Sequence, residues 1–385
     1  MRRLLLTFVC FQLFSMFLVA GDREIHVTVR NPLNQARAGE TISLSWVSIR
    51  KYDADLSPSN ITVIDQKGGA DVLSQTIGDE FLFQADFNPN ETRLFVLKVG
   101  STPRTERQSM VDGRFMKPRE DYAWENDRIA FRMYGPALAT EVSNGIDVWV
   151  KRIRSLVVQK WYKGDEDTGS ARVSYHIDHG EGADFFNVGR TLGAGGCAIW
   201  KNRKVHQPGV FSSFKTLANG PLRTVFELYY DSLNVDGEIY KERCRISLDA
   251  GQNLNRIQVT YDGSGSGQTI EIAAGLVKRA NTVEFKDKNH SWVSLWGLTN
   301  EDSTNGFLGT GVLLPNSAFK GFAEDKDQYL IVADAKTGHL LTYYAGAGWT
   351  RSGDFTSAND WNEYLSAFST RLRNPLKITI TEERK

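Results

Sequence analysis

The chain has 385 residues, of which 41% are hydrophobic and 24% are charged, and 46 lysines and arginines balance 46 aspartates and glutamates. Zero net charge, with no long block of like charges, excludes the basic stripe that a nucleic-acid binder needs. The hydrophobic share excludes disorder over most of the chain and predicts a soluble, well-packed protein. At about 150 residues per domain, the length suits two or three domains.

The first 21 residues predict a secretory signal peptide. Arg2 and Arg3 precede an apolar run at residues 4–20, and Gly21 follows it. A basic start, an apolar middle and a small-residue end are typical of a cleaved export signal, although an uncleaved anchor begins similarly. No other apolar stretch approaches the ~20 residues that span a bilayer. We therefore expect a periplasmic or secreted protein with no membrane span after cleavage.

Residues 22–103 predict an N-terminal β-rich unit. Short runs in which apolar and polar residues alternate lie at residues 25–29, 42–47, 61–65, 81–87 and 93–99. Such runs, separated by Asn, Pro and Gly, are typical of strands in a small all-β unit. The polar, arginine-rich residues 100–121 follow, and they predict a linker or a surface strap.

Residues 104–385 predict a large antiparallel β-sandwich with a few short helices. Strand-like segments occupy residues 128–133, 223–231, 240–248, 255–261, 269–276, 292–296, 329–333 and 339–345. Helical spacing appears at residues 153–162 and, after the capping candidates Ser357 and Asn359, at residues 360–371. A last strand at residues 376–381 is expected to close the large sheet. The chain shows no internal repeat and no alternation of strands with helices, so the predicted fold is mainly β.

The mature chain keeps two cysteines, Cys197 and Cys244. Neither lies in a zinc-binding or redox-pair spacing. An oxidising compartment would permit a disulfide between them, and their apolar surroundings equally fit two core residues. The sequence leaves these two alternatives open.

The densest polar cluster lies at residues 175–184 (YHIDHGEGAD). It holds two of the six histidines, His176 and His179, together with Asp178, Glu181 and Asp184. Histidine titrates near neutral pH and suits proton transfer. If residues 172–178 form a strand, His176 and Asp178 share one face of it. The alternatives are a polar sheet edge with a glycine-rich turn, and a metal site from His176, His179 and Glu181 that matches no recognised zinc pattern.

Three other segments could contact a ligand. Residues 124–128 combine an aromatic ring with acids, an amide and a guanidinium, which is the composition of a carbohydrate subsite and equally that of an internal ion-pair network. Residues 145–152 allow the same two interpretations, a carbohydrate subsite or an internal ion-pair network. Residues 339–354 add aromatic and basic residues around glycines. The candidates in these segments are Trp124, Glu125, Asn126, Arg128, Lys151, Tyr343, Tyr344 and Trp349. Strand alternation puts one of the two tyrosines in the core and the other on the opposite surface.

Four segments together resemble a family of secreted bacterial proteins from polysaccharide-utilisation loci, formerly known only as a domain of unknown function. They are WENDRIAFRMYGPAL, NGIDVWVKR, YHIDHGEGADFFNVGRTLGAGGCAIW and HLLTYYAGAGWTRSGDF, in this order. The resemblance implies a galactose-mutarotase-like β-sandwich. The resemblance extends to an ulvan oligosaccharide dehydratase. It therefore also implies a lyase that removes water from the non-reducing-end uronate and leaves a 4,5-unsaturated sugar.

That elimination needs a cation or amide on the C6 carboxylate, a base at C5 and an acid at O4. Arg128 and Asn126 could hold the carboxylate, with Trp124 beneath the ring. His176 or His179 could be the base, and the other histidine, Tyr343 or Tyr344 the acid. Glu181 and Asp178 could orient the histidines. Glu125, Lys151, Asp184 and Trp349 complete the expected binding residues.

Other functions fit the same residues. A glycoside hydrolase could use paired carboxylates such as Glu125 and Asp184. A mutarotase or epimerase could use a histidine and a glutamate, and a carbohydrate-binding protein would need no turnover. The expected partner is an acidic oligosaccharide substrate; the alternative enzymes would act on acidic sugars, and the alternative binding protein would bind a carbohydrate. The sequence predicts no cofactor, leaves room for a structural calcium ion, and leaves the oligomeric state open.

Overall fold

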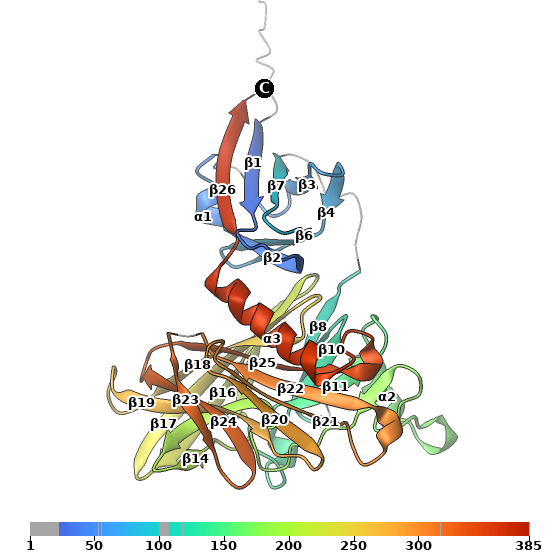
Figure 1. Cartoon of the computed structure of the whole chain (residues 1–385), viewed down its shortest axis with the longest axis vertical. Coiled ribbons are helices and arrows are strands. Elements are labelled where there is room, and N and C mark those ends of the chain that lie inside the picture. The colour runs from blue at the N-terminus through green and yellow to red at the C-terminus, as the bar shows by residue number, and fades with distance from the viewer. Residues whose placement is uncertain are drawn as a thin grey trace, which may run out of the picture.

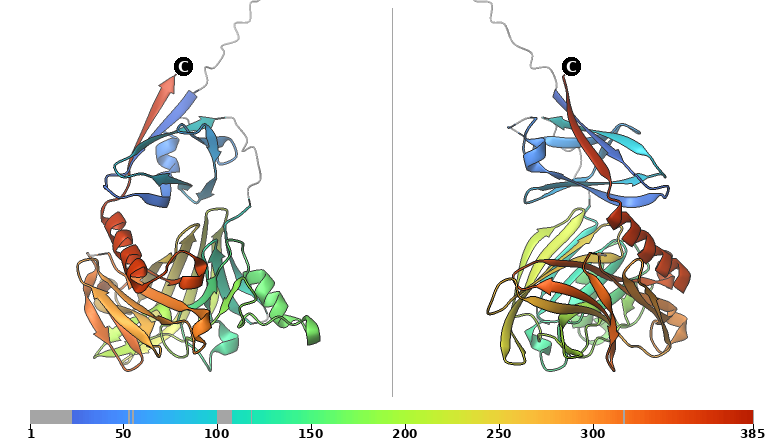
Figure 2. Two further views of the ribbon diagram at one scale, coloured as in Figure 1. Left: turned by 45° about the vertical axis from the view of Figure 1, so that its right-hand side comes forward. Right: turned by 60° about the vertical axis from the view of Figure 1, so that its left-hand side comes forward.

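A computed structural model describes residues 23–99, apart from 53 and 55, and residues 108–384, apart from 118 and 316. The predicted signal peptide lies outside the described residues. The prediction of a mainly β fold built from antiparallel sheets is confirmed. The N-terminal unit lies above the large sandwich, and helix α3 leads from one to the other (Figure 1, Figure 2).

Two sheets form the N-terminal unit. The first has the order β26-β1-β7-β3-β4, and the second has the order β2-β6-β5. Alternate side chains of β1 and β6, among them Val27 and Phe83, are buried between the sheets. The elements are β1 Arg23–Arg30, β2 Arg37–Ser45, α1 Trp46–Ile49, β3 Ile61–Asp65, β4 Ala70–Val72, β5 Ser74–Ile77, β6 Glu80–Phe87, β7 Thr92–Val99 and β26 Lys377–Arg384.

The last strand corrects one expectation. Instead of closing the large sheet, β26 pairs antiparallel with β1, with Arg23 opposite Arg384 and Arg30 opposite Lys377. The alternating residues at this end predict a strand but carry no information about its partner. Both ends of the described chain therefore lie in the N-terminal unit (Figure 1). The unit boundary at residue 103 stays a prediction.

The large sandwich has three sheets. An eight-stranded sheet has the order β15-β16-β17-β18-β25-β22-β21-β20, and two five-stranded sheets have the orders β12-β11-β10-β9-β8 and β14-β13-β19-β24-β23. The bounds are β8 Val111–Met116, β9 Asp121–Asn126, β10 Ile129–Met133, β11 Asp147–Lys151, β12 Gly182–Asp184, β13 Ala194–Lys201, β14 Lys204–His206, β15 Ser213–Asn219, β16 Arg223–Val235, β17 Glu238–Asp249, β18 Leu254–Asp262, β19 Thr269–Val277, β20 Thr282–Asp287, β21 Trp292–Leu298, β22 Phe307–Leu313, β23 Phe319–Glu324, β24 Gln328–Lys336 and β25 Leu341–Trp349.

One face of the eight-stranded sheet packs against both five-stranded sheets and forms the main core. Phe226 of β16 stacks on Tyr122 and packs against Trp124, both of β9. Tyr343 of β25 donates its hydroxyl to the main-chain oxygen of Gly195, in β13. Strand β8 lies within residues 100–121, so this part of the chain is more than the predicted linker; residues 100–107 lie outside the described range.

Two longer helices lie on the outside of the sandwich. Helix α2 starts five residues later than predicted, and α3 begins at a capping box in which the side chain of Ser357 and that of Asp360 each bind the other's main-chain N–H. Trp361 and Leu365 of α3 are fully buried against the sheet. The described helices include none long and apolar enough to cross a membrane. The bounds are α2 Val158–Glu166, α3 Ala358–Arg373, and the 3-10 turns η1 Pro136–Leu138, η2 Gly169–Ala171, η3 Ser303–Asn305 and η4 Thr350–Ser352.

A titratable group in the core predicts how stability depends on pH. Cys197 and Cys244 are both free and buried, and Cys197 lies 3.7 Å from the carboxyl group of Glu242. Burial raises the pKa of Glu242 from 4.5 to about 8. Between these two values the folded protein keeps a proton that the unfolded chain releases, so the free energy of unfolding falls as pH rises through this window.

Glu242→Gln should therefore change the pH dependence of stability. The amide cannot ionise, so the variant should match the wild type near pH 5 and be more stable than it near pH 9. Urea unfolding of both proteins across this range measures the difference. Parallel curves for the two proteins would contradict the raised pKa of Glu242.

Candidate active site

The outward face of sheet β12-β11-β10-β9-β8 carries a row of charged side chains. Because side chains alternate along a strand, Tyr122 and Trp124 point into the core and Asp121 points away from it. Arg132 of β10 lies directly opposite Asp147 of β11. Helix α2 and the segment at residues 168–181 cover this face, where Trp149 stacks on Tyr162 and Tyr175.

Arg132 lies at the centre of this row. Its guanidinium is 2.6 Å from a carboxylate oxygen of Asp147, 2.8 Å from Asp184 and 3.6 Å from Asp121. The hydroxyl of Tyr134 donates to the same oxygen of Asp147 at 3.0 Å. We call Arg132, Asp121, Asp147 and Asp184 the buried charge cluster; their side chains are at most 6% exposed.

One buried cation cannot balance three carboxylates. Burial raises the pKa of Asp121 to about 6, although the charge of Arg132 opposes this rise. Burial also raises the pKa of Asp184 well above its usual value, and the negative charge of Asp147 adds to the rise. Strongly perturbed carboxyl groups of this kind gather at functional sites more often than elsewhere.

His176 connects this buried cluster to the surface. Its Nδ1 lies 3.1 Å from the main-chain oxygen of Asp184 and 3.6 Å from the carboxylate of the same residue, and its side chain is 57% exposed. Since the main-chain oxygen of Asp184 can only accept a hydrogen bond, the neutral ring carries its proton on Nδ1. Its Nε2 then keeps a lone pair that can take up a proton, so the arrangement is that of an oriented general base.

The segment at residues 172–181, the histidine loop, is a series of turns and not the strand considered above. Asp178 holds it together by accepting from the main-chain N–H groups of Gly180 at 2.8 Å and Gly182 at 3.0 Å. Gly182 has a φ of +117°, and a Cβ there would lie 2.0 Å from a main-chain oxygen of β11, so this position requires glycine. The role of Asp178 is therefore to shape the loop.

Glu181 ties the loop to α2. Its carboxylate accepts from Lys160 at 2.6 Å and from the indole of Trp161 at 3.1 Å. The bond from Lys160 is the main cause that lowers the pKa of Glu181. Glu181 and the exposed His179 line a small cavity of about 200 Å³ between the loop and α2. His179 is therefore open to solvent on the same loop as His176.

Two carboxylates are each shared between two arginines next to the loop. Asp178 lies 3.2 Å from Arg152 and 3.3 Å from Arg351. Asp354 lies 2.5 Å from Arg128 and 2.8 Å from Arg154. We call these four residues, Arg128, Arg152, Arg154 and Arg351, the arginine rim. The ion pairs bring the end of β25 and η4 to the same edge of the molecule as β9, β10 and β11. More than 150 residues of chain separate the first two elements from the other three.

Three expected ligand-contacting aromatics are core residues, so these predictions are wrong. Trp124 is fully buried and donates its indole N–H to Asn255 at 2.7 Å. Trp349 is 1% exposed and donates to the main-chain oxygen of Asn305 at 2.7 Å. Tyr343 is also 1% exposed, and burial raises the pKa of its hydroxyl well above the usual value. None of the three has a face open to a sugar.

Glu125, Asn126 and Lys151 are committed to internal contacts, which also contradicts their predicted role in binding. The carboxylate of Glu125 accepts from Lys151 at 2.6 Å and from the N–H groups of Val157 and Val158, where α2 begins. The side chain of Asn126 donates to two main-chain oxygens in the turn after β17. The carboxylate pair suggested for a hydrolase is not open to a substrate, because Glu125 is 1% exposed and Asp184 faces Arg132.

Tyr344 lies elsewhere, in a second cavity beneath the N-terminal unit. Arg132, Asp121 and Asp147 are not among the residues predicted from the sequence, although all three lie in or beside the four segments that carry the family resemblance. Strand alternation could have shown that they point the same way, but their partnership depends on the sheet register. The described residues contain no group of three or more His, Cys, Asp or Glu side chains that could hold a metal ion.

Comparisons with known proteins identify relatives of the chain. The model of the DUF4861 family, a domain of unknown function, matches residues 29–378. Uncharacterized protein P7 of Formosa agariphila is 32% identical over 400 residues, which cover 96% of each chain. An α-mannosidase from Enterococcus faecalis V583 and a glycosyl hydrolase family 38 protein from Enterococcus faecalis align with TM-scores of 0.46 and 0.44, each at 9% identity. They cover 94% and 93% of this chain, which spans only 46% and 47% of their lengths.

Proposed function

The chain belongs to the DUF4861 family, and we propose that it is a carbohydrate-active lyase that removes water from the non-reducing-end uronate of acidic oligosaccharides, ulvan fragments first among them. The observation that carries this proposal is an exposed histidine, His176, held by the buried Asp184 next to the arginine rim. We also propose that it acts in the periplasm or outside the cell, because residues 1–21 have the composition of an export signal.

The arginine rim supplies what a uronate carboxylate needs. Arg152 and Arg351 share the single carboxylate of Asp178, so the three side chains carry a net positive charge. A guanidinium binds a carboxylate through charge-assisted hydrogen bonds. Such a contact also stabilises the charge that develops on the carboxylate when the C5 proton leaves. Arg128, one of the carboxylate-binding candidates, belongs to the same rim.

The histidine loop supplies the base and the acid. Neutral His176 takes the C5 proton on Nε2, and the electron pair of the C5–H bond forms the C4–C5 double bond. As this double bond forms, the C4–O bond breaks, and His179 donates a proton to the departing hydroxyl, which leaves as water. The carboxylate of Asp184, held in place by Arg132, stabilises the imidazolium that forms on His176, as the third group of a triad does.

The test uses a change of one group on the substrate. The protein is incubated with uronate-ended oligosaccharides and with the same chains after reduction of their carboxyl groups to alcohols. Absorbance in the enoate band should rise with the acidic chains alone, because the neutral sugar cannot stabilise charge at C5. Absence of a rise with both substrates would overturn the lyase proposal.

A further inference from the structure

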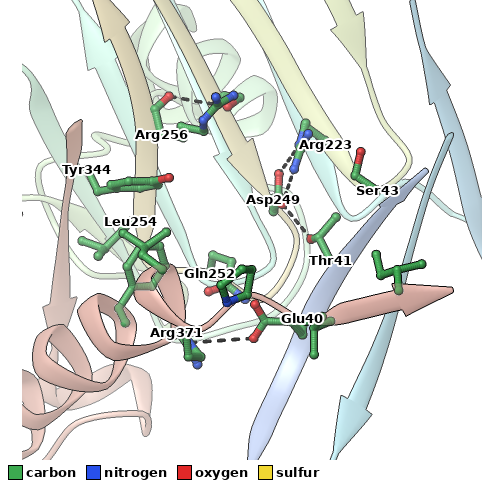
Figure 3. A pocket seen from close by; sticks show the side chains of 16 residues that line it. Glu40, Thr41, Ser43, Arg223, Asp249, Gln252, Leu254, Arg256, Tyr344 and Arg371 are labelled. Atoms are coloured by element: carbon green, nitrogen blue, oxygen red, sulfur yellow. Dashed lines mark hydrogen bonds and ion pairs between the residues drawn. The ribbon is translucent and has the colours of Figure 1, made fainter. Parts of the chain in front are cut away.

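A cavity of about 370 Å³ lies at the junction of the two parts of the molecule, outside the histidine loop (Figure 3). Strands β16, β17, β18 and β25 form its floor, β2 forms its roof, and the end of α3 forms one wall. Its lining residues include Thr41, Ser43, Arg223, Ser247, Asp249, Arg256, Tyr344, Phe368 and Arg371. This volume falls within the range of small-ligand sites.

The cavity has more cationic than anionic side chains. Arg223 is held by Asp249 at 2.5 and 2.8 Å, and Arg371 lies 3.8 Å from Glu40. No carboxylate of the described residues lies within ion-pair distance of Arg256, on the floor of the cavity. Figure 3 shows Arg256 and Tyr344 side by side. A guanidinium without an acidic partner in a partly enclosed cavity is suited to an anionic ligand.

The neighbours of Arg256 add the groups that recognise a sugar. Ser247 and Tyr344 lie directly opposite Arg256 on the two adjacent strands, so the three side chains form a row across the floor. The ring of Tyr344 is only partly buried and packs edge-on against Phe368 at 5.0 Å. Aromatic surface next to hydroxyl and guanidinium groups suits a pyranose ring with one charged substituent.

We propose that this cavity is a second carbohydrate site, which binds an anionic sugar through Arg256 and Tyr344. The charged group is a carboxylate or a sulfate ester, since a guanidinium accepts either. A sugar bound here contacts the N-terminal unit and the sandwich at once, because Thr41 and Asp249, which bond to each other at 2.7 Å across the junction, both line the cavity. The site does not depend on the reaction proposed for the histidine loop.

Calorimetric titration tests the site. All proteins carry His176→Ala and Arg351→Gln, which disable the proposed active site. The titration then measures binding at the second site alone. The probes are D-glucuronate, D-glucose 6-sulfate, D-glucose and sodium sulfate. Comparison of the first two separates a carboxylate from a sulfate preference, and the last two separate the ring from the charge. Arg256→Gln is compared with Arg245→Gln, which alters an arginine on the same sheet face that does not line the cavity.

At least one anionic sugar should bind the parent protein more tightly than D-glucose or sodium sulfate does. Arg256→Gln should weaken that binding by about tenfold or more, since a charge-assisted hydrogen bond is worth about 1.5–3 kcal/mol. Arg245→Gln should change it less than twofold. Equal affinity in both variants, or no binding of either anionic sugar to the folded parent protein, would overturn the proposal whether or not the lyase reaction is found.

Discussion

Replacement of His176 by alanine should reduce turnover of uronate-ended oligosaccharides by about a hundredfold to ten-thousandfold, the usual contribution of a general base. The fold should be unaffected, because the side chain is 57% exposed and its ring nitrogen Nδ1 contacts Asp184 at the edge of the loop. The initial rate of enoate absorbance measures the loss, and the thermal midpoint checks that the variant is folded.

His339→Ala is the matched control. This histidine is also exposed, but it lies in the turn between β24 and β25, away from the histidine loop. Its removal should leave the rate within twofold of the wild type. Activity of the His176 variant within tenfold of the wild type would remove this residue from the mechanism.

Arg132→Met should have the largest effect on stability. Methionine keeps much of the volume but leaves Asp121, Asp147 and Asp184 buried without their cation. Removal of one partner from a buried ion pair costs about 3–5 kcal/mol of unfolding free energy. The loss should be smaller near pH 5 than near pH 7, because the raised pKa values of Asp121 and Asp184 favour their neutral forms at the lower pH.

Urea unfolding at both pH values measures this loss, with Lys320→Met as the control. Lys320 also lies between two carboxylates, those of Glu271 and Asp334, but all three side chains are exposed. Solvent screens such pairs, so the control should show no measurable change. A loss below about 1 kcal/mol for Arg132→Met at pH 7 would contradict the view that this arginine stabilises the buried carboxylates.

The sequence predicts the mainly β fold class but does not predict every strand. Alternation predicts β1, β6, β17 and β18, each of which has one face in a core and one face more exposed. Strand β11, in contrast, is buried along its whole length, and β13 is rich in glycine and alanine. Apolar and polar residues do not alternate along these two strands, so the local hydrophobic pattern cannot detect them.

The sequence suggests where the proposed site lies, but it does not show which of the candidate residues are buried. Two histidines beside acids and glycines point to the loop that carries His176, because such residues are unusual in a plain turn. The assignments of Trp124, Tyr343 and Lys151 failed for one common reason. Composition shows which residue types a ligand would use, whereas burial depends on which sheet face packs against the core, and this is a tertiary property.

We propose that His176 and the arginine rim catalyse the loss of water from a terminal uronate. Mass spectrometry of intact products tests it most directly, with a purified uronate-ended oligosaccharide as the substrate. We expect a product of unchanged chain length that is lighter by one water, formed at least about a hundredfold more slowly by the His176→Ala variant. A shortened chain with saturated ends would mean hydrolysis and would contradict the account.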